Sequence, residues 1–194
     1  MDKFNFHDLK ALEPDDVVLR TGCRFDSERQ QYSVNIWRSE YKIDLNACEV
    51  HHDIAWPGIV REYMSLFVLF YLIRSKNIPP SGEWISEKDI PGGAAFFRGP
   101  HTIPSSWIAD RFGNSMEAFE ILCRKFGGTT VDFADSAFVF KIVPSIPVAV
   151  LYWQGDEDFP CEAKLLFDRT IGLHLPLDVI YALATIVCHR LGKS

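Results

Sequence analysis

The residues best suited to chemistry form an acidic stretch directly after a strongly apolar segment. Residues 156–162 include four acids and no basic side chain: Asp156, Glu157, Asp158 and Glu162. Like charges this close repel one another unless a cation, hydrogen-bond donors or solvent offset them. Carboxylate oxygens are the ligands that Mg²⁺ and Ca²⁺ prefer, so one interpretation is a hard-metal site. The alternative is a solvated turn with its bend at Gly155-Asp156.

Two residues farther along the chain extend the metal hypothesis. Asp168 ends the next candidate strand, and His174 precedes the proline that opens the last predicted helix. Asp156, Asp158 and Asp168 become the predicted metal ligands if that strand folds back toward the acids. A neutral His174 could then serve as acid or base. Its alternative role is to cap or pack.

Aromatic residues beside the acids suggest binding as well as catalysis. The chain has no phosphate-binding or dinucleotide signature, no nucleophile elbow and no zinc-protease motif. We therefore expect a surface for a protein partner or a small ligand, built from Trp153, Gly155, Asp156, Glu157, Asp158, Phe159, Asp168 and His174.

Composition limits the class of protein. The chain has 194 residues, of which 47% are hydrophobic, and its formal net charge is −6. The acidic balance argues against sequence-independent nucleic-acid binding. The most apolar stretch, residues 63–73, is too short to span a bilayer. The five cysteines have no metal-ligand spacing and are expected to be free thiols of a reducing compartment. We expect a cytoplasmic protein without a membrane or nucleic-acid partner.

The elements expected to position these residues belong to the α+β class. Apolar residues alternate around Tyr32 and Tyr41, with a turn predicted at residues 38–40. Further strands are expected over 138–142, 148–152 and 163–167. Helices are expected over 57–75 and 176–191, the first apolar on all sides and therefore central. Strands in hairpin pairs predict an antiparallel sheet packed against that long helix and several shorter ones, in one domain of residues 1–194.

The chain resembles a known family over nearly its whole length, through the turn at residues 21–23, the segment 82–85 and the long apolar helix, and most specifically in its C-terminal half. The segment from Pro144 to Pro147, the run from Trp153 to Pro160 and the stretch from Ala163 to Asp168 are similar to a bacterial and archaeal family catalogued as domain of unknown function 3786. The resemblance implies a stand-alone domain that serves corrinoid or iron–sulfur enzymes of anaerobic metabolism. Some members carry an extra four-cysteine segment. This chain lacks it, so the resemblance implies no cluster here.

Three functional hypotheses remain open from the sequence. The leading one is an accessory domain that binds a ligand or partner through the acids and the adjoining aromatics. The second is a divalent-metal-dependent, hydrolase-like enzyme that uses Asp156, Asp158, Asp168 and His174. The third is a structural or oligomerisation module whose acidic turn is a solvated tip. The sequence leaves the ligand, any cofactor and the oligomeric state open.

Overall fold

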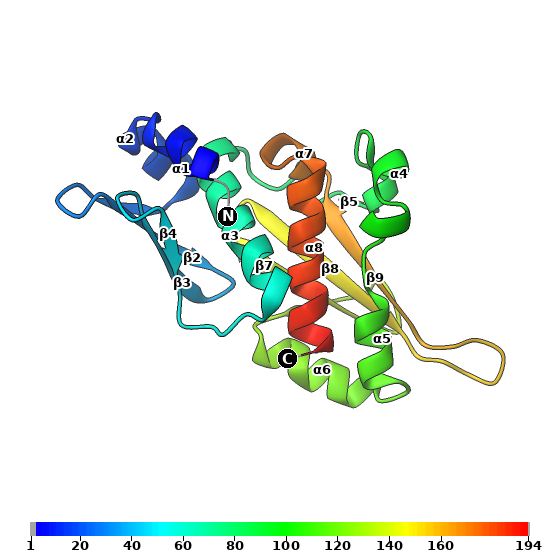
Figure 1. The fold of residues 1–194 in the computed structure, drawn as a ribbon. Helices are drawn as coiled ribbons and strands as arrows, with labels where there is room; N and C mark the ends of the chain where they lie inside the picture. Colours follow the sequence, from blue (N-terminus) through cyan, green and yellow to red (C-terminus); the bar gives the residue numbers. More distant parts are fainter. Residues whose placement is uncertain (1–2, 194) are drawn as a thin grey trace.

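Two antiparallel sheets and the helices around them make up the α+β fold (Figure 1). The structure is a computed structural model that describes residues 3–193. The first part of the chain contains α1 (Lys3–Lys10), α2 (Pro14–Thr21), β1 (Arg24–Asp26), β2 (Gln31–Ile36), β3 (Ser39–Asp44), β4 (Glu49–His51) and α3 (Gly58–Arg74). The middle contains β5 (Trp84–Ile85), η1 (Glu87–Asp89), α4 (Gly93–Phe96), η2 (Gly99–His101), α5 (Ser106–Phe112) and α6 (Met116–Lys125). The last part contains β6 (Thr129–Val131), β7 (Ser136–Val143), β8 (Ile146–Trp153), β9 (Glu162–Asp168), α7 (Ile171–His174) and α8 (Leu177–Gly192).

The smaller sheet is a meander of β1 to β4 in chain order. Tyr32 and Val34 of β2 face Ile43 and Tyr41 of β3 across the ladder, and all four side chains are buried. The period of two in burial matches the alternation of apolar residues in the sequence, because successive side chains of a strand point to opposite faces. This part of the sequence prediction is confirmed.

The turn between β2 and β3 lies one residue earlier than predicted. Ile36 pairs with Ser39, so Trp37 and Arg38 are the two turn residues, with φ of +44° and +67°. Glycine and asparagine usually occupy such positions, because positive φ strains other side chains. Trp37 holds this conformation because it is buried against the larger sheet, where its backbone N–H donates to the carbonyl of Ile142 at 2.7 Å.

The larger sheet has the strand order β5-β9-β8-β7-β6, with every pair antiparallel. The helices α3 and α8 pack against each other in front of its strands in the view of Figure 1. The predicted helix over 57–75 is therefore present as α3, and α8 is a second helix of similar length beside it, with 16 residues against 17. Phe138, Val150 and Phe167 of the sheet point into the shared core.

Aromatic rings around one arginine join the two sheets. The Trp37 ring lies 5.3 Å from that of Phe140, and its indole N–H donates to the carbonyl of Phe126 at 3.1 Å. The guanidinium of Arg190, near the end of α8, lies 4.6 Å from the Trp37 ring centroid and 4.8 Å from that of Phe126. Burial lowers the pKa of Arg190. A cation held against aromatic faces is attracted by their quadrupoles.

The lengths of the helices and the state of the cysteines bear on the environment of the chain. No helix among residues 3–193 is long and apolar enough to cross a membrane. All five cysteines are free thiols, three of them buried.

Truncation of Trp37, which joins the two sheets, should destabilise the whole fold. We expect Trp37→Ala to lower the free energy of unfolding by about 3–5 kcal/mol, because a buried ring is removed and a cavity remains. Urea unfolding followed by circular dichroism measures this loss. Leu19→Ala, at a side chain that is 75% exposed, is the control and should change stability by no more than about 0.5 kcal/mol. If Trp37→Ala lowered the free energy of unfolding as little as the control does, Trp37 would not join the two sheets as described.

Candidate functional site: the acidic loop and the outer sheet face

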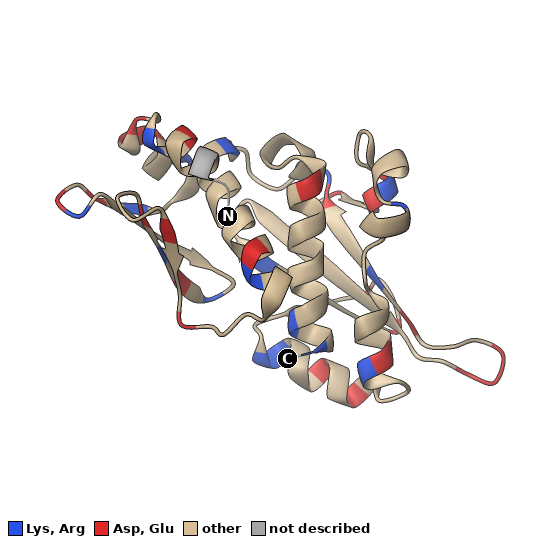
Figure 2. Ribbon diagram, in the orientation of Figure 1, with Lys and Arg blue, Asp and Glu red and all other residues tan. Residues whose placement is uncertain are grey.

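The acids predicted from the sequence lie in the connection between β8 and β9. The two strands pair from Val148 opposite Phe167 to Trp153 opposite Glu162, and residues 154–161 form the loop beyond that last pair. We call residues 154–161 the acidic loop. It projects away from the rest of the chain, with acidic residues at its tip (Figure 2). The predicted arrangement of strand, acidic loop and strand is therefore confirmed as a hairpin.

The acidic loop is shaped by its own backbone contacts. The Asp156 carboxylate accepts the backbone N–H groups of Asp158 at 2.9 Å and Phe159 at 2.8 Å, while its own N–H donates to the Phe159 carbonyl. A carboxylate that bonds the backbone two residues on is a common turn former. A side chain at Gly155 would bring its Cβ within 2.6 Å of the Cys161 nitrogen. Only glycine allows the two limbs of the loop to approach so closely.

Two polar residues from neighbouring loops hold the base of the acidic loop. Asn114 lies between α5 and α6. Its side-chain oxygen accepts the backbone N–H of Gly155 at 3.2 Å, and its backbone carbonyl accepts the side-chain amide of Gln154 at 3.1 Å. Asp135, before β7, accepts the Gln154 backbone N–H at 3.0 Å. The loop is thus fixed at its base. Glu157, Asp158 and Phe159 remain exposed at its end, Phe159 with 71% of its surface accessible.

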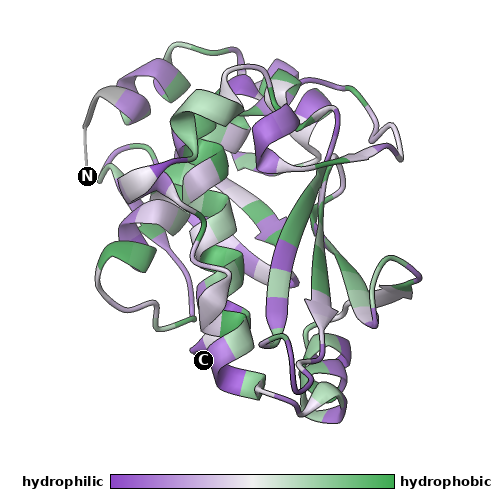
Figure 3. Cartoon of the chain, turned by 90° about the vertical axis from the view of Figure 1, so that its right-hand side faces the viewer, coloured by the Kyte–Doolittle hydropathy of each residue, from purple (hydrophilic) through white to green (hydrophobic). Residues whose placement is uncertain are grey.

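A second apolar cluster lies on the face of the larger sheet that points away from α3 and α8. We call this the outer face. In Figure 3 α8 runs down the left of the strands, and the outer face is at the right. In the described part of the chain, only strands and the β6–β7 loop contribute to the cluster. Its members are Trp84, Val131, Ala134, Ala137, Val139, Ala149, Leu151, Trp153 and Leu166.

Large side chains from both edges of the sheet meet over its small central residues. Phe133, in the loop after the edge strand β6, places its ring 6.0 Å from that of Trp84 on the opposite edge strand β5. Beneath them Ala149 is fully buried, although no helix contributes to this cluster. Phe133 itself is 41% exposed. Trp153 is half-buried at the start of the acidic loop, with the Lys164 ammonium 5.4 Å from its ring.

Asp168 lies at the far end of β9 from the acidic loop. It lies six positions after Glu162, the residue that pairs with Trp153. At the rise of an extended strand, this places Asp168 roughly 20 Å from the base of the loop. The structure therefore does not bring Asp156, Asp158 and Asp168 together on one cation, as the metal hypothesis required. Within residues 3–193, no group of three or more His, Cys, Asp or Glu side chains is arranged to hold a metal ion.

The carboxylate of Asp168 instead anchors two loops. It accepts the backbone N–H groups of Ser81 at 3.0 Å, Gly82 at 2.7 Å and Thr170 at 3.0 Å. The hydroxyls of Ser81 and Thr170 also donate to it. Burial alone would raise the pKa of Asp168, but these donors stabilise the charged form and lower the pKa to about 2.

His174, in α7, also lies outside the acidic loop and is buried. Only 1% of its surface is accessible. Its Nδ1 accepts the Lys76 backbone N–H at 3.3 Å and lies 3.2 Å from the Ser75 hydroxyl, which places it against the end of α3. Burial lowers the pKa of His174, with an opposing contribution from Asp168. These contacts match the packing role that the sequence left as an alternative.

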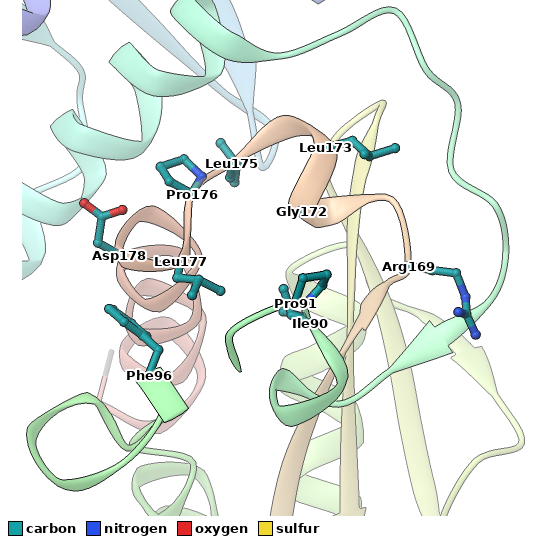
Figure 4. Close-up of a pocket in the computed structure, with 10 residues that line it drawn as sticks. All are labelled: Ile90, Pro91, Phe96, Arg169, Gly172, Leu173, Leu175, Pro176, Leu177 and Asp178. Atoms are coloured by element: carbon teal, nitrogen blue, oxygen red, sulfur yellow. The ribbon is translucent and has the colours of Figure 1, made fainter. Parts of the chain in front are cut away.

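A cleft of about 520 Å³ lies beside α7 and the start of α8 (Figure 4). Its walls are mostly apolar and include Ile90, Phe96 and Leu177. Its two charged residues, Arg169 and Asp178, lie on opposite sides of the cleft in Figure 4. Arg169 is paired with Glu83. Binding sites usually combine an apolar cavity with a few convergent polar groups, and this cleft lacks that convergence.

Sequence reasoning identified the acidic loop and Trp153 but missed most of the outer face. Trp84, Phe133 and Leu166 come from separate segments, and no local pattern links them. One signal was available: the uninterrupted apolar run of β8, in which Val150 and Leu151 point to opposite faces. A run that is apolar on both sides indicates that the second face of its sheet is also covered.

The charge on Asp168 should govern part of the acid sensitivity of the fold. We expect Asp168→Asn to lower the free energy of unfolding by about 2–3 kcal/mol at neutral pH, since charge-assisted hydrogen bonds are lost. Because the folded pKa is lowered from 3.8 to about 2, the difference from wild type is full above 3.8 and shrinks as the pH falls toward 2. Urea unfolding at a series of pH values measures this. Asp132→Asn, at an exposed acid, is the control. A difference independent of pH would count against this assignment.

Comparisons with known proteins identify the family. A scan against family models matches residues 13–190 to the family described as Domain of unknown function (DUF3786). Comparison with curated proteins found no match, and comparison with solved structures found none either. The matched region contains both sheets, the acidic loop and the outer face. Because the match covers nearly the whole chain, the resemblance noted in the sequence is confirmed: the chain belongs to the DUF3786 family.

Proposed function

We propose that this chain is an accessory binding domain that docks a protein partner through the outer face and the acidic loop together. The observation that carries the proposal is the apolar cluster of the outer face, to which no helix contributes in the described part of the chain. Its large members Trp84 and Trp153 are only partly buried, and Phe133, whose ring contacts that of Trp84, is 41% exposed. Contiguous apolar surface of this kind marks interaction sites on soluble proteins.

The types of residue favour a protein partner. Aromatic side chains supply much of the binding energy in protein interfaces, because they bury a large area with few rotatable bonds. Phe133 and Phe159 present exposed rings at two borders of the surface. Trp153 and Leu166, which belong to the apolar cluster, are half-buried and add apolar surface. Partly exposed aromatic side chains of this kind are typical of protein interfaces.

The charges around this surface specify the partner further. Asp156, Glu157 and Asp158 at the loop and Glu162 at its base are acidic, and Lys164 is the nearby base, paired with Glu162 at 3.0 Å. A partner with an apolar patch bordered by lysine or arginine would complement this arrangement. Such charges mainly raise the rate of association and exclude wrong partners, whereas the aromatic contacts supply affinity.

The class of partner is a finer proposal that rests on the family resemblance alone. The resemblance implies service to a corrinoid or iron–sulfur enzyme of anaerobic metabolism. In this proposal the cofactor belongs to the partner, and the present chain supplies a docking surface. The absorption spectrum of the purified partner tests this part separately, because corrinoids and iron–sulfur clusters absorb visible light.

Single substitutions on the surface test the docking proposal. Affinity capture from the native cells with wild type, followed by titration calorimetry on the purified protein that is recovered, gives a reference Kd. We expect Phe133→Ala to weaken that Kd by about tenfold or more, because an exposed interface ring is lost. Ile121→Ala, at a residue of α6 that is 59% exposed, is the matched control and should leave the Kd unchanged.

A loop with two fewer negative charges tests the electrostatic part. We expect Glu157→Gln with Asp158→Asn to slow association at low salt and to have little effect at high salt. These two side chains are chosen because Asp156 shapes the loop. Glu28→Gln with Asp53→Asn makes the same change in charge at exposed residues in the β1–β2 turn and after β4, and serves as the control. A partner that binds all these variants like wild type, or the absence of any protein whose capture depends on Phe133, would overturn the proposal.

A further inference from the structure

One edge of β9 is largely without a neighbouring strand. β9 has seven residues, and β5 pairs with only two of them, Phe167 and Asp168. That leaves five residues, 162–166, with β8 on one side and, in the described part of the chain, no strand on the other. An unpaired strand edge presents a row of backbone donors and acceptors that can accept another strand.

The hydrogen bonds of β5 show which residues face this edge. Arg169 donates its backbone N–H to the Glu83 carbonyl at 2.8 Å, toward the β5 side. Backbone groups of a strand alternate between its two neighbours, so Phe167, Leu165 and Ala163 direct theirs to the same side as Arg169. Phe167 meets β5. The N–H and C=O groups of Ala163 and Leu165 therefore point to the open edge.

A groove runs along this open edge. Its volume is about 850 Å³, and residues 161–166 form one wall. η1, α4 and α5 contribute the facing side, and α4 and α5 stand beside β9 in Figure 1. Phe97, Ile103 and Ala109 give this side apolar surface. The facing side also carries charged side chains, among them Lys88, Arg98 and Asp110. The groove thus offers backbone hydrogen bonds along one wall and mixed apolar and charged contacts along the other.

We infer that this groove receives an extended peptide segment of a partner protein, which adds to the larger sheet as a strand next to β9. Strand addition is a recurrent mode of peptide recognition, in which the backbone provides affinity and alternate side chains provide specificity. Ala163 and Leu165 supply the backbone hydrogen bonds. The inference does not rest on the outer-face proposal, because its backbone donors and acceptors belong to Ala163 and Leu165, which lie outside the outer-face cluster, although Leu166 lines the groove and belongs to that cluster.

Alternation along β9 defines the chemistry of the segment. Glu162 and Lys164 are exposed, whereas Ala163 and Leu165 are buried toward the core. In an antiparallel pair, side chains directly opposite one another interact, and opposite charges are favourable. The segment should therefore carry an acid opposite Lys164, a base opposite Glu162 and apolar residues at the positions between and beside them.

Selection from a displayed library of alternating apolar and charged peptides provides the probe. We expect enrichment of sequences in which an acid precedes a base by two positions, as antiparallel pairing requires. The enriched peptide is then synthesised, and its Kd is measured by fluorescence anisotropy. In amide hydrogen exchange, the peptide should slow exchange at Ala163 and Leu165. Failure to enrich any such peptide, or binding without protection of these two amides, overturns the inference.

Two variants block the groove by different means. Ala163→Pro removes one outward N–H, and proline is tolerated on edge strands when its nitrogen faces outward. Ala163→Gly keeps the N–H and is the matched control. Ser106→Trp, at an exposed α5 residue that lines the groove, blocks the space if the proline variant fails to fold. We expect Ala163→Pro and Ser106→Trp to weaken peptide binding by about tenfold or more, and Ala163→Gly to bind like wild type.

Exchange of the two charges tests the register. Glu162→Lys with Lys164→Glu keeps the ion pair within β9 but reverses its order, so the variant should prefer a peptide with base before acid. An unchanged preference would contradict strand addition opposite these residues. Sedimentation identifies the other occupant: a dimer of wild type that Ala163→Pro abolishes would assign this edge to a second copy of the chain and overturn the peptide inference.

Discussion

The relation between the two sheets depends on one strained turn. Trp37 and Arg38 hold left-handed backbone conformations without glycine, which costs about 1–3 kcal/mol for each residue. The burial of the Trp37 ring against Phe140 and Phe126, together with the Arg190 cation above it, offsets this cost. The backbone bond from Trp37 to Ile142 ties the tip of the smaller sheet directly to β7. Loss of these contacts would leave the smaller sheet joined to the larger one mainly through the helices.

The incomplete cover of the larger sheet produces both candidate surfaces. α3 and α8 occupy one face, and Phe133 and Trp84 reach over only the centre of the other. At the edge, β5 is two residues long and leaves most of β9 open. The fold thus has a closed core on the side of α3 and α8. It has partly exposed apolar side chains on the outer face and unpaired backbone groups at the open edge of β9.

The elements with strong local patterns were predictable from the sequence. The alternation around Tyr32, the apolar run of β8 and the Gly155-Asp156 bend each depend on residues a few positions apart. The role of Asp168 was not predictable, because its donors Ser81 and Gly82 are 87 and 86 residues away in the chain. The sequence also placed the β2–β3 turn one residue late, since the burial of Trp37 by distant residues overrides the local preference against positive φ.

The internal bonds of the acidic loop have a consequence for the kinetics of binding. Asp156 and Gly155 fix the shape of the tip before any partner arrives. An ordered tip loses little conformational entropy on contact, and its charge stands far out in solvent, where it acts on an approaching protein first. In the docking proposal, the loop therefore acts on the encounter itself: it would orient a basic partner during diffusion, before the aromatic residues of the outer face make contact.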